Sequence, residues 1–87
     1  MEFEWDETKR QINLAKHGLD FADVERFDWN AAVILVARRF DYGEVRLQAF
    51  AMLDGFLHQV TFTRRGEAFR IVSFRHASRK ERSLYGP

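Results

Sequence analysis

Seven basic side chains lie close together between positions 64 and 82 of this 87-residue chain. They comprise six arginines and one lysine, accompanied by only two glutamates: Arg64, Arg65, Arg70, Arg75, Arg79, Lys80 and Arg82. This segment has a charge balance of +5 and the remaining residues one of −4, so the net charge of +1 conceals a polarised molecule. A guanidinium group is a rigid, permanently charged fork that matches the geometry of a phosphate. The segment therefore predicts a surface that binds a polyanion.

Four of these arginines are predicted to gather at one end of a sheet. Alternation along a predicted strand over 68–75 places Arg70 and Arg75 on opposite faces, so at least one must emerge at an edge, a bend or a strand end. Arg64 ends the preceding strand, and a short turn brings it close to Arg70 across the hairpin. Arg79 stands in the first turn of a predicted helix, where backbone N–H groups attract anions.

The same charges could instead be solvated, or could pair with the acidic N-terminal half of the chain. We favour that interpretation for Arg65, Lys80 and Arg82. For Arg70 and Arg75, an apolar strand pattern surrounds each guanidinium group. Ordering an arginine on a sheet costs rotamer freedom, which favours a site where a planar anion meets the side chain. That anion could be an internal carboxylate.

The N-terminal part of the chain predicts two helices that come before any strand. Asp6 can cap a helix over 7–17, and Gly18 can end it in a left-handed conformation. A second, short helix is predicted over 20–26. Its apolar stripe repeats every three residues, at Phe21, Val24 and Phe27.

Four strands and a last helix follow. The strands are predicted over 31–37, 45–53, 56–64 and 68–75, with turns at 41–43, 54–55 and 65–67. The first strand is a continuous apolar run and is predicted to be buried on both faces. Ser78 to Glu81 has the capping-box pattern, which predicts a short helix to about Tyr85. Two N-terminal helices, a four-stranded antiparallel sheet and a short C-terminal helix make a single α+β domain over residues 1–87.

Composition excludes several classes of protein. The chain has no cysteine, so it has no disulfides or thiolate metal sites, and we expect a location in the reducing cytoplasm. The opening residues, MEFEWDETKR, do not form a signal peptide, and the longest apolar run, Ala31 to Ala37, is too short to cross a bilayer. No histidine pair has helical spacing and the carboxylates are scattered. We therefore expect no metal and no cofactor.

Three segments together resemble the BrnT family of bacterial toxins. They are FEWDETKRQINLAKHGLDF at 3–21, GEVR at 43–46 and RIVSFRHASRKERSLY at 70–85. The matching residues are Phe3, Trp5, Asp6, Asn13, Lys16, His17, Gly18, Arg46, Arg64, Arg70, Ser73, Arg75, Arg79, Glu81 and Tyr85. The chain departs from the family pattern at Phe74, where a small residue is usual, and at His76, where a basic residue is more usual.

The resemblance implies a RelE-like fold and a ribonuclease toxin of a type II toxin–antitoxin system. Such a toxin is a metal-independent RNA endonuclease that inhibits translation. The implied partners are an RNA substrate and a cognate antitoxin of the BrnA type, which is ribbon-helix-helix-like. Operator DNA would be contacted only through the antitoxin, and no membrane is involved.

A metal-free ribonuclease must deprotonate a ribose 2′-OH, stabilise an anionic phosphorane and protonate the departing 5′ oxygen, which leaves a 2′,3′-cyclic phosphate. Guanidinium forks suit the second task, and the candidates are Arg64, Arg70, Arg75 and Arg79. His17 is the candidate for proton transfer, although a helix-terminal role favourable to the dipole is an equal alternative. His58 lies in the middle of a predicted strand and is expected to be a satisfied, partly buried side chain.

Four further residues are candidates for contacting the substrate: Lys16, Arg46, His76 and Tyr85. The basic neighbours of His76 would lower its pKa and keep it neutral. Tyr85 could stack on a base, but we favour a packing role that anchors the last helix.

Two interpretations of other classes remain open at this point. The chain could be a non-catalytic nucleic-acid-binding module that uses the same arginines for phosphates. It could also be a protein whose basic surface receives an acidic protein partner. Cleavage of RNA separates the first of these from a ribonuclease, and the nucleic-acid affinity of an Arg75→Ala variant tests the second.

Overall fold

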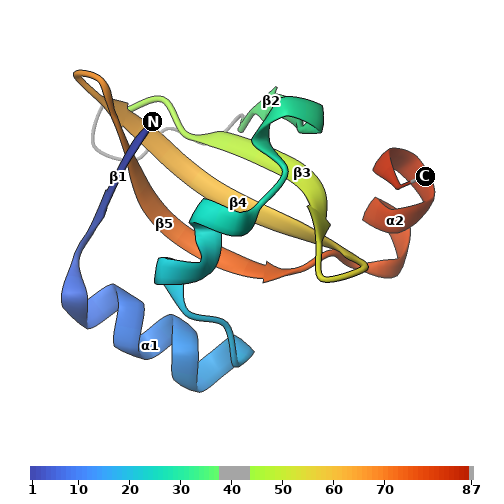
Figure 1. Ribbon diagram of the computed structural model, residues 1–87, viewed down its shortest axis with the longest axis horizontal. Helices are drawn as coiled ribbons and strands as arrows, with labels where there is room; N and C mark the ends of the chain where they lie inside the picture. The colour runs from blue at the N-terminus through green and yellow to red at the C-terminus, as the bar shows by residue number, and fades with distance from the viewer. Residues whose placement is uncertain (38–43, 87) are drawn as a thin grey trace.

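The computed structural model describes residues 1–37 and 44–86, arranged as Figure 1 shows. Along the chain the elements are β1 (Glu2–Trp5), α1 (Glu7–His17), the 3-10 helices η1 (Phe21–Arg26) and η2 (Trp29–Ala31), β2 (Val33–Val36), β3 (Leu47–Leu53), β4 (Phe56–Arg65), β5 (Ala68–His76) and α2 (Arg79–Tyr85). The strands described form one sheet in the order β1-β5-β4-β3-β2. The predicted turn over 41–43 lies outside the described residues.

The predicted four-stranded antiparallel sheet is wrong, although the α+β class is consistent with the structure. The chain begins with a strand, and β1 pairs in parallel with β5, so the sheet has five described strands and is mixed. Within this pair Phe3 lies opposite Phe69, and Trp5 lies opposite Ile71. The alternation of acidic and aromatic residues over 2–5 is a pattern of a half-buried strand. A run of four residues is too short to stand out beside the helix that follows it.

The first predicted helix is confirmed, and the second has a different form. Asp6 caps α1 by accepting a hydrogen bond from the Lys9 N–H at 3.1 Å, and Gly18 ends the helix with a φ of 71°. The second predicted helix is η1, whose three-residue turn fits the stripe at 21, 24 and 27. A strict spacing of three therefore indicates a 3-10 helix, because an α-helical stripe alternates spacings of three and four.

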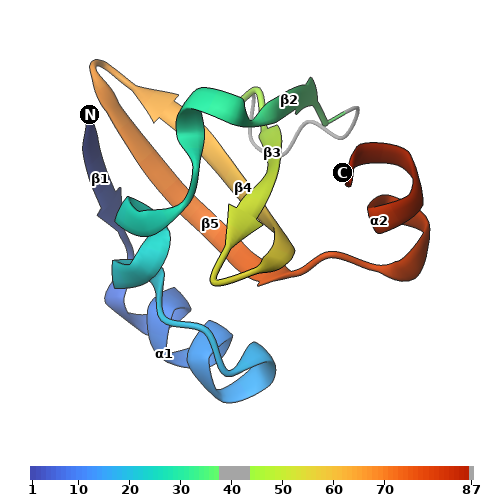
Figure 2. The ribbon, with the colours of Figure 1, turned by 45° about the vertical axis from the view of Figure 1, so that its right-hand side comes forward.

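The core lies on one face of the sheet, which η1 and η2 cover, while α1 lies along the β5 edge and α2 lies on the other side (Figure 2). The buried residues of this core are Phe21, Val24, Phe27, Ala49, Ala51, Leu53, Val60, Phe62, Ile71 and Phe74. Trp29 completes it, because its indole N–H donates to the carbonyl oxygen of Val24 at 2.8 Å. The aromatic-rich core is what a small domain without disulfides requires.

A β-bulge in β5 changes which side chains share a face. Phe62 pairs with Ile71 and Thr61 pairs with Ser73, so Val72 is an extra residue without a partner in the register. Strict alternation would place Arg70 and Arg75 on opposite faces, but the bulge restores them to the same face. The predicted arrangement of these two arginines is therefore wrong.

The outer edge of β5 has two different partners. β1 pairs with it only as far as Ile71. Beyond that point the side chain of Asn13 replaces a strand: its Nδ2 donates to the carbonyl oxygen of Phe74 at 2.8 Å, and the Phe74 N–H donates to its Oδ1 at 3.1 Å. Asn13 is buried. This contact fixes α1 against β5 and so positions the C-terminal end of the helix.

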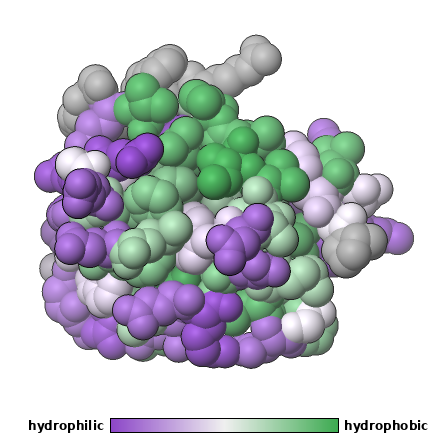
Figure 3. All heavy atoms as spheres, turned by 45° about the horizontal axis from the view of Figure 1, so that its top comes forward, coloured by the Kyte–Doolittle hydropathy of each residue, from purple (hydrophilic) through white to green (hydrophobic). Residues whose placement is uncertain are grey.

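β2 is an edge strand and is largely exposed, which contradicts its predicted burial on both faces. It lies last in the sheet order, and Val36 is 60% exposed and Ile34 47% exposed. Apolar side chains consequently reach the surface, and Figure 3 shows hydrophobic residues gathered on the face that it draws. No helix among the described residues is long and apolar enough to cross a membrane.

Candidate functional site

The face of the sheet opposite the core carries polar side chains from two neighbouring strands. Three pairs lie directly across from one another on β4 and β5: Gln59 with Arg75, Thr61 with Ser73, and Thr63 with Arg70. Because β-strand side chains alternate, these pairs stand on one face while Val60, Phe62 and Phe74 point into the core. The face therefore presents two guanidinium groups in a row of hydroxyl and amide groups.

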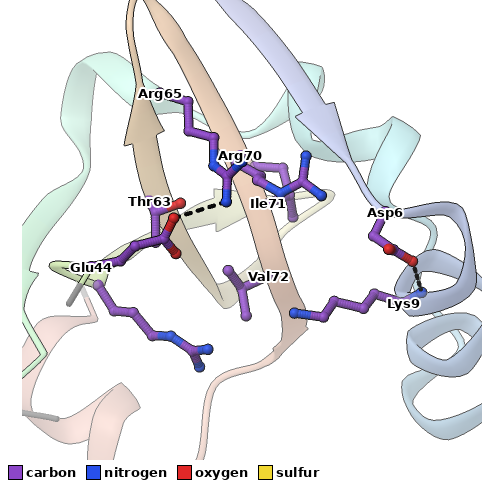
Figure 4. A pocket seen from close by; sticks show the side chains of 9 residues that line it. Asp6, Lys9, Glu44, Thr63, Arg65, Arg70, Ile71 and Val72 are labelled. Atoms are coloured by element: carbon purple, nitrogen blue, oxygen red, sulfur yellow. Dashed lines mark hydrogen bonds and ion pairs between the residues drawn. The ribbon is translucent and has the colours of Figure 1, made fainter. Parts of the chain in front are cut away.

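A pocket of about 280 Å³ lies near the β4–β5 turn, and we call it the β4–β5 pocket (Figure 4). It is lined by Asp6, Lys9, Glu44, Arg46, Thr63, Arg65, Arg70, Ile71 and Val72. Arg65 donates to Glu44 at 2.8 Å, and Arg70 donates to Glu4 of β1 at 2.8 Å. Four cationic side chains thus surround a pocket whose lining includes two carboxylates.

A second pocket, of about 240 Å³, lies between α1 and β5, and we call it the α1–β5 pocket. It is lined by Lys9, Ile12, Asn13, Lys16, His17, Val72 and Ser73. The five helical residues are spaced so that they share one face of α1. That face lies along β5 because Asn13 is bonded to the backbone of Phe74. Lys16 and His17 therefore lie near the bulge at Val72.

His17 is the titratable group that stands out in the α1–β5 pocket. Its pKa lies below the ordinary value, first because of burial, and then because of the positive charges of Lys16, Arg75 and His76. At neutral pH the imidazole is therefore uncharged and can accept a proton. Ser73, which lines this pocket, stands on the same face of β5 as Arg75, two residues further along the strand.

Arg75 is held in a fixed orientation by Glu81 of α2. Its two terminal nitrogens donate to the two carboxylate oxygens at 2.7 and 3.0 Å. The same carboxylate accepts the Ser78 N–H at 2.8 Å, and the Glu81 N–H donates to Ser78 Oγ at 3.1 Å, which confirms the predicted capping box. These hydrogen bonds lower the pKa of Glu81 to about 2, with Arg75 the largest cause. The guanidinium group therefore reaches the polar face already oriented.

The structure brings together some of the predicted site residues and separates others. Arg70 and Arg75 share the polar face, but about four strand steps separate them, or roughly 13 Å. Arg64 pairs with Phe69 on the opposite face, where its guanidinium group lies 5.7 Å from that ring. The prediction that four arginines gather in one pocket is therefore wrong for Arg64. It failed because residues adjacent in a strand point to opposite faces.

Two predicted residues belong to α2, Arg79 at its start and Tyr85 at its end. Arg79 is exposed at the start of α2, where the capping box already uses the Ser78 and Glu81 N–H groups. Tyr85 stacks on Phe50 with ring centroids 4.4 Å apart, so the predicted packing role is confirmed.

The remaining histidines lie beside each other at the end of β5. His58 is buried and its Nδ1 lies 2.8 Å from the carbonyl oxygen of Phe56, which confirms the predicted satisfied side chain. His76 is exposed and its ring centroid lies 4.4 Å from that of His58. The register places both on the core face.

Sequence reasoning missed Lys9 and the polar residues of β4. Lys9 and Lys16 are seven residues apart, so they share one helix face, and this spacing could have identified Lys9. Thr63 belongs to the alternation of polar residues at 59, 61, 63 and 65, which marks a strand face turned away from the apolar core. In residues 1–37 and 44–86 no group of three or more histidines and carboxylates could hold a metal ion.

The family model described as the ribonuclease toxin BrnT of type II toxin–antitoxin systems matches residues 5–81. This range contains both pockets, Arg75 and Glu81. A comparison with curated proteins found no match.

Proposed function

This chain belongs to the BrnT family of ribonuclease toxins of type II toxin–antitoxin systems, and we propose that it cleaves RNA internally, without a metal ion, and thereby inhibits translation. The observation that carries this proposal is the uncharged His17 in the α1–β5 pocket together with the oriented Arg75, which shares a face of β5 with Ser73 of that pocket. A neutral imidazole supplies a base, and a fixed guanidinium group supplies the charge that a phosphorane requires.

The proposed reaction gives each of these groups one role. His17 removes the proton from a ribose 2′-OH, and the 2′ oxygen attacks the adjacent phosphorus atom. The bond from phosphorus to the 5′ oxygen breaks, and the Lys16 ammonium group in the same pocket supplies the proton that this oxygen takes up. The products are a 2′,3′-cyclic phosphate and a free 5′-OH. Arg75 stabilises the charge on the non-bridging oxygens during the step.

The antitoxin of this system is proposed to be of the BrnA type, with a ribbon-helix-helix-like domain. That domain contacts operator DNA, so this chain reaches DNA only through the antitoxin. The basic polar face supports an antitoxin that presents acidic residues to it, because complementary potentials favour association. We place the toxin and its substrate in the cytoplasm.

Cleavage in a chelator tests this function. Purified protein is mixed with end-labelled RNA in EDTA, and the 3′ ends of the products are analysed. We expect 2′,3′-cyclic phosphate ends and a loss of cleavage in a His17→Asn variant that melts like the wild type. Intact RNA at high protein concentration, with binding that weakens as salt rises, would instead identify a non-catalytic binding module.

A further inference from the structure

The β4–β5 pocket has the properties of an anion site apart from the cleavage centre. We infer that it binds a second phosphate of the RNA, which lies on the same strand as the cleaved phosphate but is not itself cleaved. This inference rests on the proposed function, because it assigns a role to a pocket of the same polar face. Three observations support it: a buried hydroxyl, a lysine that extends into the pocket, and the spacing along β5.

Thr63 supplies the buried hydroxyl. Its side chain lines the pocket, its exposed fraction is 2%, and its Oγ1 has no hydrogen-bond partner among the described residues. An unsatisfied buried polar group costs free energy, and native structures contain few of them. A hydroxyl donates one hydrogen bond, which an oxygen of a phosphate can accept. Thr63 lies directly across from Arg70, so both would meet the same anion.

Lys9 adds a second cation from another element. Figure 4 shows its side chain extending from α1 toward Val72 of β5, on the side of the pocket away from Glu44. Within the described part of the chain, its ammonium group makes no ion pair with a carboxylate. Arg70 uses one nitrogen for Glu4, and a guanidinium group has five N–H donors, so others remain for a ligand.

The two carboxylates in the lining already have partners. Glu44 is bonded to Arg65, and Asp6 caps α1 through the Lys9 backbone N–H. Their charges are therefore partly offset. What remains is a hydroxyl, an ammonium group and a guanidinium group that line one pocket from three elements, which is the donor set of a phosphate site.

Spacing shows that this phosphate differs from the cleaved one. Arg70 and Arg75 share a face, but roughly 13 Å of strand separates them. One phosphate cannot bridge both, whereas a single strand of RNA laid along β5 reaches both. The pocket therefore anchors the substrate while the reaction occurs near His17.

The experiment measures binding separately from cleavage. Fluorescence anisotropy gives the affinity for a labelled RNA that carries a 2′-O-methyl group at its mapped cleavage position, or throughout if no cleavage is found. Thr63→Val removes the hydroxyl and keeps the shape, and Thr63→Ser restores the hydroxyl. We expect the valine variant to bind about tenfold more weakly and the serine variant to bind like the wild type. The melting temperature of Thr63→Val should be equal to or above that of the wild type.

Neutral linkages locate the phosphate. Replacing one linkage at a time with a methylphosphonate removes one charge from the RNA. At one linkage other than the cleaved one, we expect the methylphosphonate to weaken binding to the wild type. The same methylphosphonate should not weaken binding to Thr63→Val. Lys9→Ala should reduce the slope of log affinity against log salt concentration by about one, the value for one phosphate contact. Lys80→Ala on α2 serves as the matched control.

Two results would overturn the inference. One is a Thr63→Val variant that binds the RNA as tightly as the wild type. The other is that the methylphosphonate whose effect on affinity disappears in Thr63→Val is the one at the cleaved linkage itself. Failure of the proposed function looks different, because the binding effects of Thr63 and Lys9 would remain while no RNA is cleaved.

Discussion

Arg75 and Glu81 face each other across the junction of β5 and α2 through two hydrogen bonds, of 2.7 and 3.0 Å. Both side chains are partly buried, so the pair is stronger than an exposed ion pair. Glu81 also closes the capping box of α2. One carboxylate thus both begins a helix and orients the proposed catalytic guanidinium group.

Replacing Glu81 with glutamine should therefore lower the stability of the protein. We expect the free energy of unfolding to fall by about 1–2 kcal/mol, since charged hydrogen bonds are replaced by weaker ones. Urea denaturation measures this change. Glu67→Gln, at an exposed position in the β4–β5 turn, is the matched control. Equal stability of Glu81→Gln and wild type would show that the pair contributes nothing.

The stability that Glu81 contributes should depend on pH in a defined direction. Its folded pKa of about 2 lies below the ordinary value of 4.5, so folding favours the ionised form. The contribution is complete above about pH 4.5 and is lost as the pH falls toward 2. Denaturation of wild type and Glu81→Gln at a series of pH values measures the difference. The gap between the two proteins should close in acid, and a gap that stays constant would contradict this assignment.

His17 should govern the acid limb of the cleavage rate. The base must be uncharged, so the rate falls as pH drops through its pKa, and this midpoint should lie below the ordinary value of about 6.5. His17→Asn should reduce kcat by about 10²–10⁴-fold and remove this limb. The pH dependence of single-turnover cleavage provides the measurement. An acid limb that persists unchanged in the variant would assign the base elsewhere.

Asn13 should be important for stability because its side chain is bonded to the backbone of β5. Asn13→Ala leaves the N–H and the carbonyl oxygen of Phe74 without their partner. We expect the free energy of unfolding to fall by about 2–3 kcal/mol. Gln11→Ala on the exposed side of α1 is the control. Thermal unfolding measures both, and a variant as stable as the control would show that water replaces the amide at no cost.

Arg64 and Arg75 should behave differently, since they lie on opposite faces of the sheet. Arg64→Ala should change cleavage less than twofold, whereas Arg75→Ala should reduce it by about 10²–10³-fold. Rates on the same RNA at saturating protein make the comparison, with unfolding curves to confirm that both variants fold. A large effect of Arg64→Ala would mean that RNA contacts the core face of the hairpin as well.

Local signals in the sequence predicted much of the fold. The cap at Asp6, the stop at Gly18 and the capping box at Ser78 each depend on a few neighbouring residues, and all three were confirmed. The Asp54-Gly55 hairpin is confirmed as well, with φ values of 52° and 86° that such a turn requires. These features can be read from sequence because their hydrogen bonds join residues close together in the chain.

The errors concern contacts between residues far apart. Whether β1 pairs with β5 depends on a partner more than 60 residues away. The bulge at Val72 depends on how β4 lies against β5, and a simple alternation pattern contains no signal for it. The candidate site inherited this error, because the faces of Arg70 and Arg75 depend on the bulge. Thr63 was missed for a related reason, since a threonine in a strand gives no sign of the pocket that it lines.

The Asn13 side-chain amide, which replaces a length of strand, also occupies backbone groups with which another chain could pair. β5 is nine residues long, and β1 covers only part of its outer margin. Without Asn13, the backbone at Phe74 would offer free hydrogen-bonding groups to any extended chain nearby. The helix that carries the proposed base therefore also occupies this margin, and displacing it would expose the strand edge and move the proposed base in the same step.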